Sequence, residues 1–445
     1  MIIFADELMT KNNIYDMRIF RLMAVAACLL AAATSLTVSA AQSRPVKDLF
    51  KKAPRTNVDG INYKLNVKDH EAIVVAGEGL YTGEITIPEK ITVDSVTYYV
   101  EEIDDNAFKK CASLVKVNIP TTVTVIGSSA FEDCTSLTEI TIPTSVKKIE
   151  DNLFTGCSCL TTVNLHDGIT SIEHNAFKKC SALESIKLPS GITSLPYNVF
   201  MDCSSLKNVE LPLALEKIGY SAFQNCTSLE TIDIPNSVKA IGWVAFKNCT
   251  SLQSFSFTTS MDNIANSIFE GCSSLKEVNI TNSIRGIDHD AFKGCSSLDS
   301  IYIPNNVKSL ASSIFEDCSG LKVVNIPAGI KEIPSKMFKN CASLKNIVIP
   351  SSVKEIGSGA FMGCHSMTEV DIPSSVTEIG GDAFNECHAL MKVVLRAGRP
   401  AKIKKDTFSK AMQKEGTFYV PNTFVYQSDP KSVWIKFRNF KNINL

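Results

Sequence analysis

Apolar residues recur along most of the chain with a period of 23 positions. One phenylalanine marks each copy, no insertion interrupts the series, and a cysteine follows three residues later in every copy. A fixed period of this length indicates a repeat architecture, in which each copy packs on its neighbours instead of around one central core. The pattern therefore predicts a solenoid of thirteen turns, marked by Phe108, Phe131, Phe154, Phe177, Phe200, Phe223, Phe246, Phe269, Phe292, Phe315, Phe338, Phe361 and Phe384.

The apolar positions within one copy predict a short strand followed by a return. Counted from the phenylalanine, leucine stands at +6, and branched aliphatic residues or leucine stand at +9 and +11. Because strand side chains alternate, we expect a strand over +8 to +11, with +9 and +11 facing inward and +8 and +10 facing outward. Proline at +12, in nine of thirteen copies, lacks an N–H and would end the pairing. The Val-x-x-Ile-Gly stretch is expected to cross back, and Ser-Ala-Phe-x-x-Cys to form one helical turn that places the phenylalanines in a continuous spine.

The repeated motif A-F-x-x-C-x-S-L-x-x-I-x-I-P-x-S-V-x-x-I-G resembles the BspA-like class of leucine-rich repeats, and the resemblance covers Ile103–Leu395. It implies an α/β-type repeat solenoid that is mostly β, with 13 tandem 23-residue units, a parallel sheet, a β-rich N-terminal cap and a small C-terminal cap. Such repeats occur on many surface proteins of host-associated bacteria. The motif is specific for the fold and weak evidence for any one ligand.

The N-terminus predicts export. Residues 22–40 are apolar or small, follow Arg18 and Arg21, and end in Val38-Ser39-Ala40, which favours a secretory signal peptide over residues 1–40. Acidic residues before Met17 make that methionine the candidate true start. The alternatives are an uncleaved membrane anchor and a lipoprotein acylated at Cys28.

The remaining flanks predict a lead-in and two caps. Residues 41–57 are polar and predict a flexible segment, and residues 58–102 carry short β-prone runs that predict a small antiparallel cap. Residues 396–445 are predicted to close the other end of the array. Their aromatic residues, including Phe418 and Trp434, leave an aromatic binding platform as the alternative.

Charge and cysteine content exclude several classes of protein. The net charge is −1 with both signs interspersed, which argues against nucleic acid or a membrane surface as a partner. Fifteen cysteines suggest a disulfide scaffold by number, but thirteen lie in one column of a parallel stack, where their Cβ atoms would be too far apart to bridge. We therefore expect buried free thiols, with Cys159, which lies off the column, exposed.

Metal and catalytic sites have little support. Cys364-His365 and Cys387-His388 form a zinc-like ligand set at equivalent positions, but cysteine should point inward and histidine outward. The serines follow the repeat register, and no nucleophile elbow or phosphate loop occurs. We expect no enzymatic activity, no cofactor and no metal.

The outward face of the predicted sheet is the remaining candidate site. Its +8 and +10 columns vary from copy to copy, which suits a rigid scaffold that binds an extended partner. The candidate partner-binding residues are Lys187, Glu210, Asp233, Asn279, Tyr302 and Asn325. Irregular copies around His166, Phe255, Phe257, Thr258 and Thr281 could mark a contact zone or reflect ordinary drift.

Together these features predict an exported adhesin-like protein, at the cell surface or secreted, that binds host extracellular-matrix proteins or proteins on other bacteria. A periplasmic location would fit the same signals. The alternatives are a glycan- or nutrient-binding module and a structural spacer of the cell envelope. Glycan binding should need a cluster of exposed aromatic residues on one face, and the outward columns show mainly Tyr302.

Overall fold

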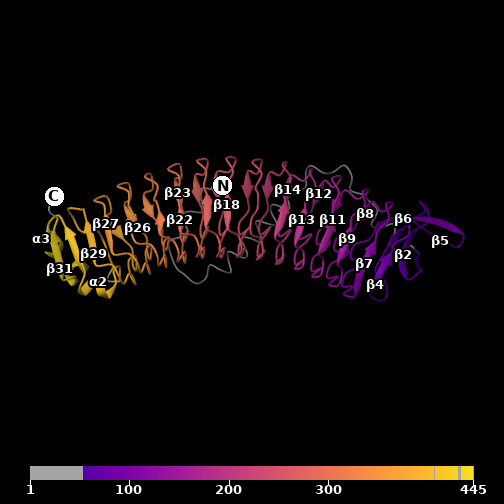
Figure 1. Ribbon diagram of the computed structural model, residues 1–445, viewed down its shortest axis with the longest axis horizontal. Helices are drawn as coiled ribbons and strands as arrows, with labels where there is room; N and C mark the ends of the chain where they lie inside the picture. Colours follow the sequence, from indigo (N-terminus) through magenta and orange to yellow (C-terminus); the bar gives the residue numbers. More distant parts are fainter. Residues whose placement is uncertain (1–53, 405, 429–431, 444–445) are drawn as a thin grey trace. The chain divides into compact units, whose positions relative to one another are not determined.

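The computed structural model describes residues 54–404, 406–428 and 432–443. The predicted signal peptide and most of the predicted lead-in lie outside these residues. Residues 55–445 form one unit, in which the repeats lie side by side as successive turns (Figure 1). The predicted parallel-sheet solenoid is confirmed, and the described residues contain almost no helix.

The first parallel ladder occupies the predicted strand positions, and we call it the front ladder. Its short strands show the predicted alternation, since +9 is buried or half-buried and +8 and +10 are mostly exposed. Within the described residues, the copies of Phe223 and Phe338 contribute no assigned strand to this front ladder. The strands are β7 (Leu114–Asn118), β9 (Glu139–Thr141), β11 (Thr162–Asn164), β13 (Ser185–Lys187), β15 (Asn208–Glu210), β18 (Ser254–Ser256), β20 (Glu277–Asn279), β22 (Ser300–Ile301), β24 (Val323–Val324), β27 (Glu369–Ile372) and β29 (Lys392–Leu395).

A second parallel ladder, the back ladder, forms where the sequence predicted only a crossing. Each copy from that of Phe108 to that of Phe361 contributes two residues, of which the second is an inward isoleucine or leucine, and the copy of Phe384 contributes only the bridge from Lys402 to Glu378. The strands are β8 (Val125–Ile126), β10 (Lys148–Ile149), β12 (Ser171–Ile172), β14 (Ser194–Leu195), β16 (Lys217–Ile218), β17 (Ala240–Ile241), β19 (Asn263–Ile264), β21 (Gly286–Ile287), β23 (Ser309–Leu310), β25 (Glu332–Ile333), β26 (Glu355–Ile356) and β28 (Glu378–Ile379).

The segment around each phenylalanine does not form the predicted helical turn. Residues at −2 and +2 have positive φ, as at Asn106 (60°) and Lys110 (64°). A right-handed helix cannot continue through a left-handed residue, so the chain makes consecutive tight turns. The bends let alternate N–H groups donate to the next copy, for example from Phe108 to the carbonyl of Ala130 at 2.8 Å. These bonds between copies satisfy backbone groups that would otherwise be buried without partners.

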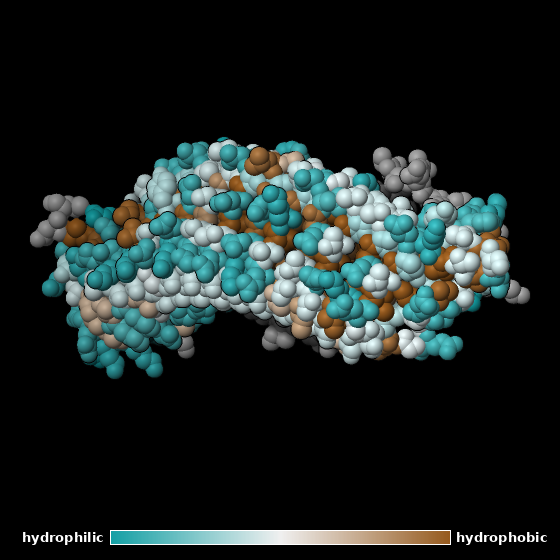
Figure 2. Space-filling view, turned by 45° about the vertical axis from the view of Figure 1, so that its right-hand side comes forward, coloured by the Kyte–Doolittle hydropathy of each residue, from teal (hydrophilic) through white to brown (hydrophobic). Residues whose placement is uncertain are grey.

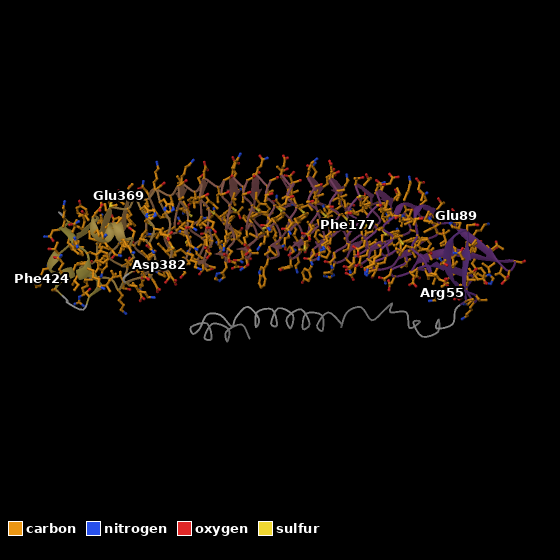
Figure 3. The ribbon with its side chains drawn as sticks, turned by 90° about the horizontal axis from the view of Figure 1, so that it is seen from below. Arg55, Glu89, Phe177, Glu369, Asp382 and Phe424 are labelled. Atoms are coloured by element: carbon orange, nitrogen blue, oxygen red, sulfur yellow. The ribbon has the colours of Figure 1, made fainter. Side chains whose placement is uncertain are left out.

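The predicted phenylalanine spine is confirmed. All thirteen rings are fully buried, and neighbouring centroids lie 5.2–5.8 Å apart with planes within 19° of parallel. Phe177, labelled in Figure 3, is one of these interior rings.

The column cysteines are buried free thiols, as predicted, and Cys159 is exposed. The structure adds a role for them, because each thiol from Cys134 onward donates to the phenylalanine carbonyl of the preceding copy. These twelve contacts measure 3.0–3.3 Å. Burial raises the pKa of these thiols, so they stay protonated and keep their donor. Cysteine therefore suits this column because it is small and apolar and still donates a hydrogen bond.

The N-terminal cap is mixed and not purely antiparallel. It contains β1 (Arg55–Val58), β2 (Ile61–Asn66), β3 (Glu71–Val74), β4 (Gly83–Thr86), β5 (Lys90–Val93) and β6 (Val96–Ile103). Its strand order is β1-β2-β3-β6-β5, and β3 pairs with β6 in parallel. β6 continues into the back ladder through β8, while β4 starts the front ladder through β7. Tyr81 closes the spine with its ring 4.9 Å from that of Phe108. The cap therefore supplies one strand to each ladder and one aromatic ring to the spine at the first repeat.

The C-terminal segment extends the ladders before closing them. Its elements are α2 (Lys410–Lys414), β30 (Thr417–Val420), α3 (Thr423–Gln427), η1 (Val433–Lys436) and β31 (Asn439–Asn442), and β29, β30 and β31 pair in parallel. Phe408 stacks on Phe384 at 5.4 Å as one more ring of the spine. Phe418 and Trp434 are buried, and the Trp434 indole N–H donates to the Ala401 carbonyl at 2.8 Å. The alternative of an aromatic platform is therefore wrong for these two residues.

Candidate partner-binding surfaces

The outer face of the front ladder carries the six residues predicted from the sequence. Five are exposed, namely Lys187, Glu210, Asp233, Asn279 and Tyr302, whereas Asn325 is half-buried. The Asn325 amide accepts a hydrogen bond from the Ile303 N–H and donates one to the Ile303 carbonyl, both at 2.8 Å. This side chain therefore clamps two neighbouring turns together.

Ion pairs between neighbouring copies occupy much of the front face. Lys187 and Glu210 face each other on β13 and β15, with their charged atoms 3.2 Å apart. Lys392 and Glu369 form an equivalent pair at 2.8 Å on β29 and β27. Most of this face is thus a solvated surface whose charges are already paired.

Three successive copies replace charge with exposed apolar side chains. Tyr302, Val323 and Val348 stand at outward positions of the copies of Phe292, Phe315 and Phe338, and they are 63%, 65% and 83% exposed. Brown, hydrophobic residues also reach the surface among teal ones in Figure 2. Contiguous exposed apolar residues with a polar surround are typical of protein-binding surfaces. We call these three residues the front apolar cluster.

The irregular copies turn out to be structural. Phe255 and Phe257 are 3% exposed and pack edge-on against the Phe269 ring, so they enlarge the core. The Thr258 hydroxyl donates to the Val238 carbonyl at 2.8 Å, and the His166 ring contacts the Val146 carbonyl at 3.1 Å. The Thr281 hydroxyl likewise donates to the Thr258 carbonyl at 3.2 Å, so the side chains that replace the usual proline bind the preceding turn.

A second surface lies on the outer side of the back ladder. A hollow of about 330 Å³ opens there across three copies, bounded by Glu173, His174, Tyr197 and Lys217. It exists because Ser171 and Ser194 stand where the flanking copies carry Lys148 and Lys217. The sequence reasoning missed this hollow.

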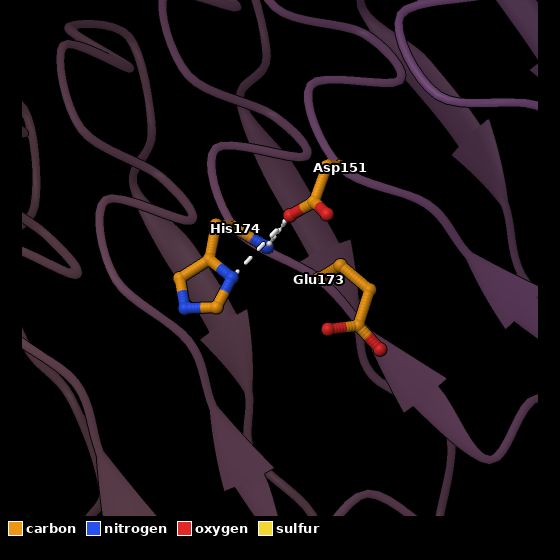
Figure 4. Close-up of side chains that lie close together, drawn as sticks. All are labelled: Asp151, Glu173 and His174. Atoms are coloured by element: carbon orange, nitrogen blue, oxygen red, sulfur yellow. Dashed lines mark hydrogen bonds and ion pairs between the residues drawn. The ribbon is translucent and has the colours of Figure 1, made fainter. Parts of the chain in front are cut away.

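Beside the hollow, Asp151, Glu173 and His174 bring their ligand atoms within 4.8 Å of one another (Figure 4). Each acid already has a structural partner. The Asp151 carboxylate accepts the His174 backbone N–H at 3.0 Å, and Lys148 lies 3.3 Å from the Glu173 carboxylate. The ammonium of Lys148 competes with any cation for this position, so the cluster does not indicate a metal site.

The Cys-His pairs diverge as predicted. The thiols of Cys364 and Cys387 are buried and donate to carbonyls of the spine. The rings of His365 and His388 are exposed and stack on each other at 5.1 Å. The four side chains therefore cannot converge on one tetrahedral ion.

Comparison with known proteins decides the family. The sequence profile described as "BspA type Leucine rich repeat region (6 copies)" matches residues 101–230, 193–322 and 285–415, which together span more than half of the chain. The chain belongs to the BspA-type leucine-rich repeat family. A leucine-rich repeat protein from Bacteroides ovatus ATCC 8483 is 30% identical with a TM-score of 0.79, and the match covers 87% of this chain and 100% of that one. A leucine rich cell surface protein from Faecalibacterium prausnitzii A2-165 is 32% identical with a TM-score of 0.55, and the match covers 76% of this chain and 94% of that one. None of the curated proteins matches the chain.

This BspA-type protein carries one further set of surface residues that the sequence reasoning overlooked. Position −3 holds His174, Tyr197, Tyr220 and Trp243 in four consecutive copies, and all four are exposed. Comparing position −3 across all copies would have revealed the row, since the position is otherwise mostly Ser, Asp or Asn. Among the residues that the structure describes, no helix combines the length and apolarity needed to cross a bilayer.

Proposed function

We propose that this BspA-type protein is an exported binding protein of the cell surface that acts as an adhesin. Its front face engages proteins of the host extracellular matrix or proteins on other bacteria. The predicted signal peptide supports export. A relative that is 32% identical is described as a cell surface protein, which supports the location.

The observation that carries the proposal is the front apolar cluster. Tyr302, Val323 and Val348 each leave most of the side chain in water, which is costly unless a partner covers it. Protein interfaces concentrate their binding energy in a few large apolar or aromatic side chains surrounded by polar ones. Here Lys322 and Asp299, 4.0 Å apart, supply part of the polar surround. The cluster thus has the composition of an interface centre.

The test is binding of the purified full chain to immobilised fibronectin, laminin and collagen. We expect at least one of them to bind. The double substitution Tyr302→Ser with Val348→Ser should weaken that binding by at least about tenfold, which corresponds to about 1.4 kcal/mol. Leu213→Ser is the matched control, because Leu213 is 87% exposed in the turn after Pro212 and lies outside the front ladder.

Two outcomes would contradict the proposal. Absence of binding to every matrix protein and to intact cells of co-resident bacteria would remove the adhesin function. Equal losses from Leu213→Ser and the double substitution would remove the front face as the site. Protease treatment of intact cells gives an independent test of location, since repeat peptides should be released while cytoplasmic and periplasmic markers stay intact.

A further inference from the structure

The strongest unexplained feature is the row of rings at position −3, away from the front face. Tyr197, Tyr220 and Trp243 are 45%, 45% and 58% exposed, and His174 precedes them with its ring 5.0 Å from that of Tyr197. We call these four residues the back aromatic row. Exposed aromatic side chains in four consecutive copies need an explanation, because the spine needs only the phenylalanines.

The backbone holds the row in register. The carbonyls of His174, Tyr197, Tyr220 and Trp243 accept bonds of 2.9–3.1 Å from the N–H groups of Asn152, Asn175, Asn198 and Ser221. Each carbonyl is therefore tied to the preceding copy, and successive side chains start about 4.8 Å apart, the spacing of paired strands. The four side chains are therefore held at the repeat spacing by a hydrogen-bonded backbone.

The polar groups of Tyr197, Tyr220 and Trp243 are available, whereas Nδ1 of the His174 ring already lies 3.3 Å from the Asp151 carboxylate. Within the described part of the chain, the hydroxyls of Tyr197 and Tyr220 and the indole N–H of Trp243 make no hydrogen bond to protein, and Lys217 makes no ion pair. A row of rings with free donors suits a ligand that presents both C–H faces and hydroxyl groups.

The hollow lies at the first half of the row. His174 and Tyr197 bound it together with Glu173, Lys217 and the hydroxyls of Thr170 and Thr193. Its volume of about 330 Å³ lies at the low end of small-molecule sites, which is enough for one or two sugar rings. An extended ligand that enters the hollow would therefore continue over Tyr220 and Trp243.

We propose that the back aromatic row and the hollow form a binding site for a neutral, linear polysaccharide. The apolar C–H face of a pyranose ring stacks on the electron-rich face of an aromatic side chain, and its hydroxyls bond to carboxylates, hydroxyls and ammonium groups. The repeat spacing lets consecutive rings contact consecutive parts of an extended chain.

Charge favours a neutral glycan over a polyanion. Glu173 and Lys217 bring opposite charges to the rim of the hollow, and Lys148 is already shared between Glu150 and Glu173 at 2.9 and 3.3 Å. Lys217 is the single lysine or arginine among the described residues that line the hollow, whereas an acidic polysaccharide would require a group of cations. Serine and threonine hydroxyls line the hollow beside the apolar Ile172, Ile192, Leu195 and Pro196, a mixture that suits a ligand with both hydroxyl groups and C–H faces.

The experiment is native electrophoresis of the full chain in gels containing barley β-glucan, pullulan or galactomannan, with heparin as the polyanion. We expect at least one neutral polysaccharide to slow the protein. Trp243→Ala and Tyr197→Ala should each weaken that binding by about tenfold, which corresponds to about 1.4 kcal/mol, because each removes one ring on which a sugar stacks. Tyr302→Ala is the matched control, because it removes an exposed ring from the front face and should leave glycan binding unchanged.

Tryptophan fluorescence gives a second measurement. The chain has two tryptophans, and Trp434 is buried while Trp243 is exposed. Acrylamide quenching therefore reports mainly on Trp243, and a bound glycan should protect it from the quencher.

The inference is overturned if no neutral polysaccharide slows the protein, if only heparin does so and salt abolishes the effect, or if Trp243→Ala and Tyr197→Ala bind as the wild type does. Loss of binding to a protein ligand in these variants, without any glycan binding, also overturns it. Because Tyr302→Ser with Val348→Ser tests the adhesin proposal, failure of either site is distinguishable from failure of the other.

Discussion

The inside and the outside of each turn differ in how much sequence variation they tolerate. Phenylalanine and cysteine occupy their two inward columns in all thirteen copies, while the outward columns hold lysine, glutamate, asparagine, tyrosine and valine. An inward residue contacts its own equivalents above and below, so one change affects two interfaces. An outward residue contacts water and, at most, a neighbour across one strand. The residue type is therefore restricted at inward positions, whereas outward positions are free to vary and can serve binding.

The two outer faces also differ from each other. The front face pairs most of its charges across strands and exposes three apolar residues together. The outer side of the back ladder exposes a row of rings beside a hollow lined by both polar and apolar residues. One scaffold can thus present two chemically distinct surfaces, because each column varies independently of the others.

The largest effect that we expect is destabilisation of the packed interior at alkaline pH. Burial, the largest cause, raises the pKa of Cys226 and Cys249 well above the ordinary value of 9.0, and it raises the pKa of Cys387 to about 12. Below pH 9 folded and unfolded chains both keep these protons, so the thiols add no pH dependence. Above pH 9 the unfolded chain loses them and the folded chain does not. Stability should then fall by up to about 1.4 kcal/mol per pH unit for each buried thiol.

This alkaline transition can be followed by circular dichroism in urea at pH 7, 9, 10 and 11 with a reductant present. Cys226→Ala should make the fall less steep above pH 9. Cys159→Ser should not change the slope, because Cys159 is exposed. A free energy of unfolding that stays flat to pH 11 would contradict the prediction.

Removal of one spine ring should have the next largest effect. Phe223 is fully buried and lies 5.5 and 5.3 Å from the rings of Phe200 and Phe246. Phe223→Ala should lower the free energy of unfolding by about 3–5 kcal/mol, because it removes buried area and leaves a cavity between two stacked rings. Urea denaturation measures the loss. Tyr302→Ala, which removes an exposed ring, should change it by less than about 0.5 kcal/mol, and similar losses for both variants would refute the contrast between inside and outside.

The front ladder and the spine were predictable because their signals are local and repeated. Alternation over four positions shows which side chains face inward, and the same alternation recurs at the same positions of the thirteen copies. The back ladder was not predictable from one copy, since two residues with a single inward isoleucine, as in Lys148–Ile149, are too short to show a period of two.

The absence of a helical turn and the positions of the binding surfaces were not predicted, for other reasons. Asn, Asp or Gly, which favour the left-handed conformation, stand at 17 of the 26 such positions in the repeats, but Ser, Lys, Glu and Val stand at the others, so the signal emerges only when the copies are compared. The back aromatic row becomes visible only when one position is compared across copies. The hollow depends on small side chains at Ser171 and Ser194 between longer neighbours, which is a property of the assembled surface.

A strained residue two positions before Phe246 allows a stabilising change. Val244 has φ of 49°, a left-handed conformation that a β-branched side chain adopts only with strain, whereas Asn198 has φ of 57° at the equivalent position. Val244→Asn should raise the free energy of unfolding by about 1 kcal/mol. The reverse change, Asn198→Val, should lower it by more, because it also removes the 3.0 Å bond from the Asn198 amide to the Asn175 side chain. Loss of stability in Val244→Asn would mean that packing of the valine outweighs the strain.

The smallest effect is expected from the ion pair on the front face. Lys187 and Glu210 form a 3.2 Å pair, but their side chains are 75% and 70% exposed, so water and salt screen most of the attraction. Lys187→Ala, Glu210→Ala and the double variant should each change the free energy of unfolding by less than about 0.5 kcal/mol, with a coupling energy near zero in 0.15 M salt. If these variants nevertheless weaken binding to a matrix protein, the interface extends well beyond the front apolar cluster. A coupling energy above about 1 kcal/mol would instead make the pair part of the scaffold, and the outward columns would then be less free to vary than the comparison of inside and outside implies.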